Sequence, residues 1–343
     1  MTTITKSTMM TTANMKTMTN TPTRQSTWRW TRHDFRAMNT DVTVELLSDR
    51  TNSQDLVLDV ERLFASVERR LSRFNPASEL SQLNAAPQAA FVASPLLIDA
   101  VEAALWAASA TAGLYDPTLL DALESAGYDR SFERIEFPEP LSQSSPVFAA
   151  NRASSAAHYR PFTFRSIQVN RARRQIIRPA GLRLDLGGMG KGWTVDRAAD
   201  ALQGLGPFLV NAGGDLFAYH SPPGKNGWLI EISHPLNPEE TVAQIELHHR
   251  ALATSTIARR RWRHNGQLKH HLIDPRTGCP AQTDAISVSV TAPRTVIAEV
   301  YAKIALILGV ERGLAFLQDL PDVEGLIVAA DTSVHQTKDF NLI

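Results

Sequence analysis

The chain has 343 residues, of which 43% are hydrophobic and 20% charged, enough apolar material for one large domain or two modest ones. Its 35 Lys and Arg residues balance 35 Asp and Glu residues, and a net charge of zero argues against a general nucleic-acid-binding surface. The single cysteine, Cys279, excludes an intramolecular disulfide and favours a reducing compartment.

The N-terminal segment differs from the rest of the chain. Residues 1–32 are rich in Thr and Met and have neither an apolar run nor periodicity, which predicts a disordered tail instead of a signal peptide. Residues 33–343 are predicted to form the folded domain. The most apolar long segment, residues 95–113, carries Asp99 and Glu102, so we expect no membrane span and a cytoplasmic protein.

The first half of the chain predicts one strand and two helices. Val42, Val44 and Leu46 alternate with polar residues, as in a half-buried strand. Apolar residues recur at helical spacing over residues 56–71, and a second helix is predicted over residues 96–112. Residues 131–165 are rich in Ser, Pro and Ala, which predicts a variable loop with room for a short hairpin.

The second half mixes strands with helices. Strands are predicted over residues 182–186, 208–210, 216–219, 228–233, 242–247, 286–291 and 325–329. Helices are predicted over residues 193–202, 295–309 and 311–318. Because the strands arrive in runs and do not alternate strictly with helices, the pattern favours an α+β fold over a doubly wound sheet.

A glycine-rich segment joins a predicted strand to a predicted helix. Residues 185–192 read Asp-Leu-Gly-Gly-Met-Gly-Lys-Gly, and exposed amides at the helix start together with Lys191 favour an anion such as pyrophosphate. It is not a P-loop, because Gly192 follows the lysine, and Trp193 replaces the third glycine of a dinucleotide fingerprint. In isolation, a tight turn with a surface lysine explains the segment equally well.

Three further segments are turn-like when taken alone. They are Tyr115-Asp-Pro-Thr118, Asn211-Ala-Gly-Gly-Asp215 and His271-Leu-Ile-Asp-Pro-Arg-Thr-Gly278. The third contains His271, whose imidazole can exchange a proton near neutral pH. A lone histidine is more often structural than catalytic, so both interpretations stay open for this segment alone.

Together, these segments occur in the order found in one known family. From about residue 35 to residue 317 the chain resembles the ApbE family of FAD:protein FMN transferases. Met38-Asn-Thr40 is similar to the Met-Gly-Thr of the family, and residues 185–192 are similar to its Asp-Leu-Gly-Gly-Ile-Ala-Lys-Gly. The other matching blocks are residues 71–84, 115–118, 211–215, 253–255 and 271–278.

The resemblance implies an α+β fold of the ApbE-like, T-fold-related type, with two parts and a flavin cleft between them. It implies a reaction in which a Thr or Ser hydroxyl of a partner flavoprotein attacks the pyrophosphate of FAD, so that FMN becomes attached and AMP leaves. His271 would be the general base, Phe74 would stack on a ring, Asp185 would accept from the adenine amino group, and Lys191 would contact the pyrophosphate. The implied FAD contacts are Met38, Phe74, Leu114, Tyr115, Asp116, Asp185, Gly188, Lys191, Gly213, Gly214, Asp215, Thr254, Ser255, Ile273 and Asp274.

The chain departs from the family at the implied metal site. Family members usually use Mg²⁺, to which Gly188 would offer its carbonyl and the block Ala-Asp-Ala-Leu-Ala-Thr its Asp and Thr. Here that block reads Ala298-Glu-Val-Tyr-Ala-Lys303, so Glu299 replaces the Asp and Lys303 replaces the Thr. Glu299 stays a candidate metal ligand together with Gly188, because its longer side chain could still reach a cation. Because an ammonium group cannot ligate a cation, we hypothesise that Lys303 takes the place of the metal and pairs with Glu299. With Asn39 and Thr256 replacing family glycines, this indicates a divergent branch.

Two other functions remain alternatives at this stage. The first is an FAD-binding protein without transferase activity, such as a carrier, sensor or scaffold. The second is an FAD pyrophosphatase, in which water replaces the acceptor hydroxyl. The Glu299–Lys303 pair is the feature that separates these functions. With this altered metal site, a reaction at the pyrophosphate would be weakened, lost or made independent of metal. The acceptor's own motif lies in the partner's sequence.

Overall fold

The computed structural model describes residues 28–135, 163–340 and 342–343. Residues 1–27 of the predicted tail and most of the predicted variable loop lie outside the described residues. Among the described helices, none is both long and apolar enough to cross a membrane.

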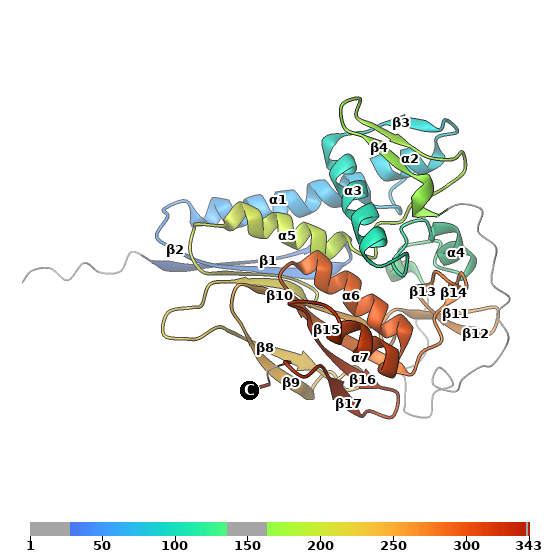
Figure 1. Ribbon diagram of the computed structural model, residues 1–343. Helices are drawn as coiled ribbons and strands as arrows, with labels where there is room; N and C mark the ends of the chain where they lie inside the picture. The colour runs from blue at the N-terminus through green and yellow to red at the C-terminus, as the bar shows by residue number, and fades with distance from the viewer. Residues whose placement is uncertain (1–27, 136–162, 341) are drawn as a thin grey trace, which may run out of the picture.

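The centre of the molecule is an eight-stranded sheet in the order β1-β2-β6-β7-β10-β15-β16-β17 (Figure 1). Its strands are β1 (Arg29–Ala37), β2 (Thr40–Ser48), β6 (Phe208–Ala212), β7 (Asp215–Tyr219), β10 (Arg250–Thr256), β15 (Ala285–Ala292), β16 (Glu324–Ala329) and β17 (Val334–Gln336). Each neighbouring pair in this order is antiparallel. This sheet confirms the predicted α+β class.

Four helices pack on the sheet: α1 (Ser53–Leu71), α5 (Gly190–Leu202), α6 (Thr295–Leu308) and α7 (Val310–Gln318). The apolar stripe of α1 is buried, as its spacing predicts. The start of α6 is fixed by α5, because the Asp196 carboxylate accepts from the backbone amides of Thr295 at 2.7 Å and Val296 at 3.0 Å. The β8–β9 hairpin (Trp228–Ser233, Thr241–Leu247) lies below β10 in Figure 1, away from α5 and α6.

A second, smaller part sits above one end of the sheet (Figure 1). It contains α2 (Glu79–Ala85), α3 (Pro95–Ala110) and a small sheet of β3 (Ala90–Val92), β5 (Gln175–Ile177) and β4 (Gln168–Asn170). Its apolar side chains form their own buried cluster. Pro95 opens α3, and the Ser94 hydroxyl accepts from the Leu97 amide at 3.3 Å, which caps the helix.

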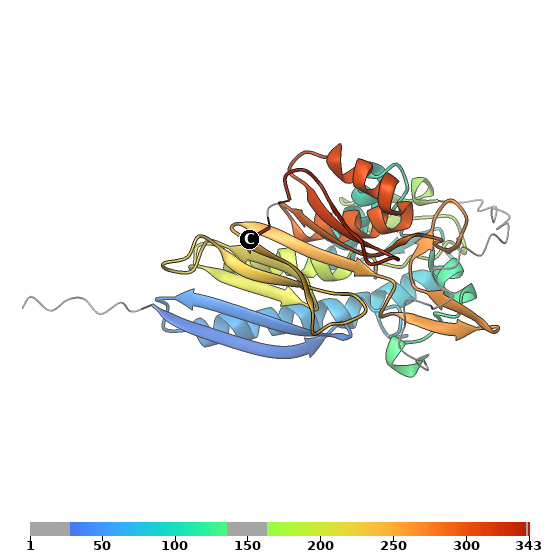
Figure 2. The same ribbon diagram turned by 90° about the horizontal axis from the view of Figure 1, so that it is seen from below.

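A group of short elements packs together around a third apolar cluster. They are α4 (Leu120–Ser125), the 3₁₀ turn Phe132–Arg134, and two ribbons, β11 (Arg261–His264) with β12 (Gln267–His270) and β13 (Ile273–Asp274) with β14 (Cys279–Pro280). The other 3₁₀ turn is Phe164–Ser166. Figure 2 shows these ribbons projecting from the same end of the sheet as α4.

Two structural predictions are wrong. Residues 182–186 form no strand, because the Asn84 side chain satisfies the backbone of Leu184 on both sides, at 2.8 Å to its amide and 2.8 Å to its carbonyl. Residues 29–32 belong not to the tail but to β1, which pairs with β2 along its whole length and has mostly polar residues because it is an edge strand. The folded region therefore begins before residue 33.

Candidate functional site

Two cavities meet where the smaller part adjoins the sheet. The smaller cavity has a volume of about 380 Å³ and the larger one about 1390 Å³. We call the six residues that line both cavities the shared wall: Asn39, Gly187, Lys191, Arg260, His271 and Lys303. Three of these side chains are cationic, so the shared wall is suited to an anionic group.

The smaller cavity gathers residues that lie far apart in the chain. Nine of the residues implied by the family resemblance line it: Met38, Phe74, Leu114, Tyr115, Asp116, Asp185, Gly188, Lys191 and Ile273. The Tyr115 hydroxyl is buried here without a hydrogen-bond partner among the described residues. Burial raises the pKa of this phenol well above 10, so it remains a donor. Because a buried donor without a partner is costly, the cavity fits a ligand with an acceptor group.

A buried arginine that sequence reasoning missed organises one side of the smaller cavity. Arg73 Nε lies 3.1 Å from Asp185 Oδ1, and its Nη2 donates to the Tyr128 carbonyl at 2.9 Å. Its guanidinium carbon also lies 4.1 Å from the centre of the Phe74 ring and 4.6 Å from that of Tyr128. The only available signal was its position directly before Phe74 in the matching block. Arg73 therefore positions both Asp185 and Phe74.

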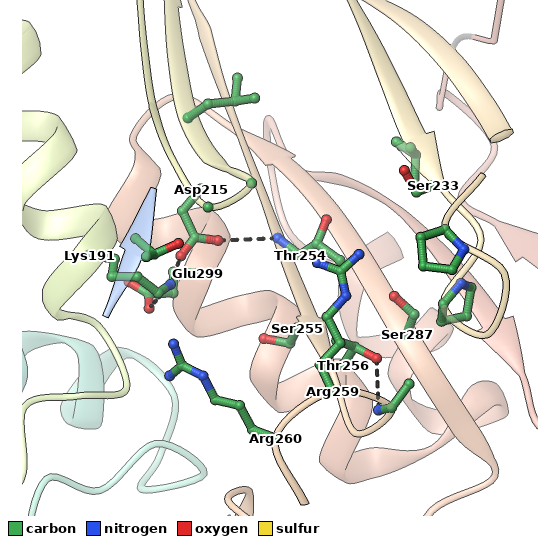
Figure 3. A pocket seen from close by; sticks show the side chains of 18 of the residues that line it. Lys191, Asp215, Ser233, Thr254, Ser255, Thr256, Arg259, Arg260, Ser287 and Glu299 are labelled. Atoms are coloured by element: carbon green, nitrogen blue, oxygen red, sulfur yellow. Dashed lines mark hydrogen bonds and ion pairs between the residues drawn. The ribbon is translucent and has the colours of Figure 1, made fainter. Parts of the chain in front are cut away.

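The glycine-rich segment brings Lys191 to the shared wall. Gly192 lies in the first turn of α5, and a Cβ there would be 2.7 Å from the carbonyl oxygen of Thr295, so glycine allows α5 and α6 to approach closely. In this arrangement the Gly192 amide donates to Glu299 Oε2 at 2.7 Å. Lys191 Nζ lies 3.1 Å from Glu299 Oε1 and also pairs with Asp215 (Figure 3).

The β6–β7 turn presents Asp215 to this lysine. Gly213 and Gly214 have φ values of 65° and 95°, which a two-residue hairpin turn requires, and the Asn211 side chain accepts from the Gly214 amide at 2.8 Å. The Asp215 carboxylate also accepts from the Thr254 amide at 3.3 Å (Figure 3). The turn thus places one carboxylate, that of Asp215, in contact with both β10 and Lys191.

A second turn supplies Met38 and Asn39. These residues connect β1 to β2 with φ values of 52° and 59°, a conformation that glycine adopts without strain and that asparagine tolerates best among the other residues. Asn39 therefore suits this turn position, where the family has a glycine. This departure from the family pattern has a local explanation.

His271 is oriented by the backbone. Its Nδ1 lies 3.2 Å from the Arg260 carbonyl oxygen. Because a carbonyl only accepts, Nδ1 carries the proton and Nε2 is free to accept one. Burial, reinforced by Arg260 and Lys303, lowers the pKa of His271 well below 6.5, so the imidazole is neutral at pH 7. A neutral, oriented imidazole on the shared wall fits the role of general base.

All but one of the remaining FAD contacts implied by the resemblance line the larger cavity. Gly213, Gly214, Asp215, Thr254 and Ser255 line it, together with Arg259 and Ser233. Figure 3 shows Ser233 across the pocket from Asp215. Asp274 lines neither cavity. Its carboxylate accepts from the Arg276 amide at 2.9 Å and from Arg276 Nη2 at 2.7 Å, so its place in the structure is the turn between β13 and β14.

The predicted pairing of Glu299 with Lys303 is wrong. Lys303 Nζ donates to the Gly188 carbonyl at 2.6 Å, whereas Glu299 is bonded to Lys191 and to the Gly192 amide. In the described part of the chain, no group of three or more His, Cys, Asp or Glu residues is placed to hold a metal. A Mg²⁺ ion on the Gly188 carbonyl does not fit this arrangement, because an ammonium group already occupies that position.

The chain matches one protein family and is similar to several known proteins. The model of the ApbE family matches residues 38–327. The FAD:protein FMN transferase of Treponema pallidum is 29% identical over 289 residues, covering 80% of this chain and 77% of the relative, and that of Vibrio cholerae is 27% identical over 268 residues, covering 77% and 76%. The crystal structure of the ApbE protein of Thermotoga maritima has the same fold, with a TM-score of 0.77 and 22% identity over 91% of this chain and 98% of the other.

Proposed function

Because the chain belongs to the ApbE family, we propose that it is an FAD:protein FMN transferase. It transfers the FMN part of FAD to a Thr or Ser hydroxyl of a partner flavoprotein and releases AMP. The observation that carries this proposal is the shared wall, where three cations and a neutral imidazole lie between the smaller cavity, lined by Phe74, Tyr115 and Asp185, and the larger one.

The adenosine half of FAD occupies the smaller cavity. Asp185 accepts from the adenine amino group, Phe74 packs against the ring, and the buried Tyr115 hydroxyl donates to the ligand. The pyrophosphate then lies at the shared wall beside Lys191 and Arg260. The FMN half extends into the larger cavity, where the acceptor protein approaches it.

The reaction is a single phosphoryl transfer. The acceptor hydroxyl oxygen forms a bond to the phosphorus that carries riboflavin, and the bond from that phosphorus to the AMP oxygen breaks. The hydroxyl proton moves to Nε2 of His271, and AMP leaves with the electron pair of the broken bond. The cations of the shared wall stabilise the charge that develops on the phosphoryl oxygens.

The resting charges are compatible with these roles. Burial lowers the pKa of Lys191, while its neighbour Glu299 acts in the opposite direction. A bound pyrophosphate places further negative charge beside this ammonium and beside His271, so it raises the pKa of both groups. The imidazole thus gains basicity only when the substrate is present.

The test is an in vitro transfer assay. Purified protein is mixed with FAD and a flavodoxin-like acceptor domain, and the intact mass of the acceptor is measured. We expect a mass increase equal to one FMN group minus water, on a Thr or Ser located by peptide sequencing. If the protein binds FAD in a separate measurement but modifies no acceptor from several acceptor families, the result would instead support an FAD-binding protein without transferase activity.

A further inference from the structure

Lys303 occupies a special position within the site. It lies four residues after Glu299 on α6, so the two side chains project from the same face of the helix. Its Nζ donates to the Gly188 carbonyl at 2.6 Å, and its side chain lines both cavities. The ammonium group therefore sits at the shared wall, where the pyrophosphate of FAD would lie.

The space around this ammonium group is closely fitted. A Cβ on Gly188 would clash with Lys303 Nζ and come within 3.1 Å of the Tyr115 ring. Nζ itself lies 5.8 Å from the centre of that ring, on the side of the smaller cavity. Glycine at position 188 thus leaves room for a lysine head group against the backbone.

The nearby carboxylates are engaged elsewhere. Glu299 accepts from the Gly192 amide at 2.7 Å and lies 3.1 Å from Lys191 Nζ, and Asp215 also pairs with Lys191. A divalent cation at the Gly188 carbonyl would have to displace Lys303, and it could take Glu299 or Asp215 as a further ligand only by breaking these bonds. The negative charges of the site are therefore balanced by lysine side chains.

The ammonium group retains bonding capacity for a ligand. A protonated lysine has three N–H donors, and in the described part of the chain Lys303 uses one of them, on Gly188. Burial lowers the pKa of Lys303 to about 8, so at pH 7 the group is still mainly protonated. A pyrophosphate beside it would favour the protonated form further.

We propose that Lys303 is a built-in substitute for a divalent cation: its ammonium group binds the pyrophosphate of FAD, and FMN transfer by this chain needs no metal ion. The proposal rests on the proposed function. It assigns Lys303 to catalysis, as a group that touches the substrate, and it explains why the Asp and Thr of the family are Glu299 and Lys303 here. With this altered pair, the Lys303 ammonium group supplies the positive charge at the reacting phosphates that a metal ion would otherwise supply.

The experiment measures FAD affinity by calorimetry and FMN transfer by acceptor mass, each in EDTA and in excess Mg²⁺. The proteins compared are the full chain, Lys303→Met, which keeps an unbranched side chain one atom shorter and without charge, and Lys338→Met at an exposed position. A fourth protein, Glu299→Asp with Lys303→Thr, restores the family pair. Circular dichroism and thermal melting confirm that each variant is folded.

For the unaltered chain and Lys338→Met we expect the same FAD affinity and transfer rate in EDTA and in Mg²⁺. Lys303→Met should lower FAD affinity roughly 10- to 100-fold in both conditions, the range for losing a hydrogen bond to a charged group. The double variant should transfer FMN in Mg²⁺ and lose this activity in EDTA.

Two results would overturn the proposal: FAD affinity of the unaltered chain that depends on Mg²⁺, or a Lys303→Met variant that binds FAD as the unaltered chain does. The affinity measurement on the unaltered chain needs no variant and no acceptor, so it tests the proposal even if Lys303→Met does not fold. If no acceptor is modified while FAD binding is metal-independent and weakened in Lys303→Met, the transferase function fails but the role of Lys303 in binding stands.

Discussion

His271 is the residue whose chemistry the structure defines most closely. Its Nδ1–H donates to the Arg260 carbonyl, which leaves Nε2 free to take the proton of the acceptor hydroxyl. We expect His271→Ala to slow FMN transfer by roughly 10²- to 10⁴-fold, the usual contribution of a general base, with FAD affinity nearly unchanged. Single-turnover transfer rates and calorimetry measure the two effects. His248→Ala, at an exposed position, is the control, and a normal rate in His271→Ala would exclude this role.

Arg73 and Asp185 form a buried ion pair, with exposed side-chain fractions of 6% and 17%. Removing one partner leaves the other charge buried and unpaired, so Arg73→Met and Asp185→Asn should each lower the free energy of unfolding by about 3–5 kcal/mol. The double variant should lower the free energy of unfolding by clearly less than the sum of the two single variants, because neither charge is then left buried without a partner. Urea unfolding of the four proteins measures this coupling, and strictly additive costs would show that the pair is not coupled.

Most of the site residues predicted from the sequence line the cavities, but the side-chain partners of these residues could not be predicted. Met38, Tyr115 and Ile273 could be predicted because they lie within blocks that match the family. Arg73 could not, because nothing in a one-dimensional pattern shows that its guanidinium lies against the rings of Phe74 and Tyr128. The substitution at Lys303 was visible in the sequence, yet its partner was not, because the Gly188 carbonyl lies 115 residues away in the chain.

The contact between helices α5 and α6 depends on the absence of a side chain at Gly192. A Cβ at this position would lie 2.7 Å from a backbone oxygen, which must move, whereas a Cβ on Gly190 would meet only the end of Met38 at 3.7 Å. We expect Gly192→Ala to lower the free energy of unfolding by about 1–3 kcal/mol and Gly190→Ala to have little effect. Thermal and urea unfolding test this, and equal costs for the two variants would contradict it.

The β12–β13 connection carries a buried histidine that makes stability depend on pH. Burial lowers the pKa of His270 to about 4, and its Nε2–H donates to the Ala281 carbonyl at 2.9 Å. The unfolded chain binds this proton near pH 6.5, so between pH 6.5 and pH 4 the unfolded state holds more protons. The free energy of unfolding therefore falls as the pH falls through this window, by about 3 kcal/mol from this residue.

His270→Gln removes the titrating group and keeps a side-chain amide that can donate. Its free energy of unfolding should therefore fall less steeply between pH 6.5 and pH 4 than that of the unaltered chain. Urea midpoints at several pH values give the comparison, because the other titrating groups contribute equally to both proteins. Parallel pH profiles for the two proteins would mean that His270 does not titrate in this window.

Periodicity predicted the elements where side-chain burial repeats along the chain. The helix over residues 56–71 and the strands at 228–233 and 286–291 are present as α1, β8 and β15. The strand at 182–186 failed because Asn84, 100 residues away, satisfies its backbone. The pattern also missed β10, in which Thr254 and Thr256 break the apolar run because they face the larger cavity.

At the scale of the whole molecule, the proposed function divides FAD between two cavities, with the adenosine half in the smaller one and the FMN half in the larger one. The antiparallel sheet holds Asp215, Thr254 and Glu299 on one side of the shared wall through β7, β10 and α6, and the smaller part closes the other side with Phe74 and Tyr115. The sequence predicted this two-part arrangement through the family resemblance. It could not predict that the two cavities share a wall, which depends on how the parts dock.

The most direct test of the account is the ratio of AMP released to FMN attached in the same reaction. The protein is incubated with FAD and an acceptor domain, AMP is quantified by chromatography, and the attached FMN is quantified by intact mass. Transfer predicts one AMP for each FMN on the acceptor, with both products lost in His271→Ala and no AMP without an acceptor. AMP and free FMN forming at the same rate without an acceptor would contradict transfer and establish hydrolysis of FAD instead.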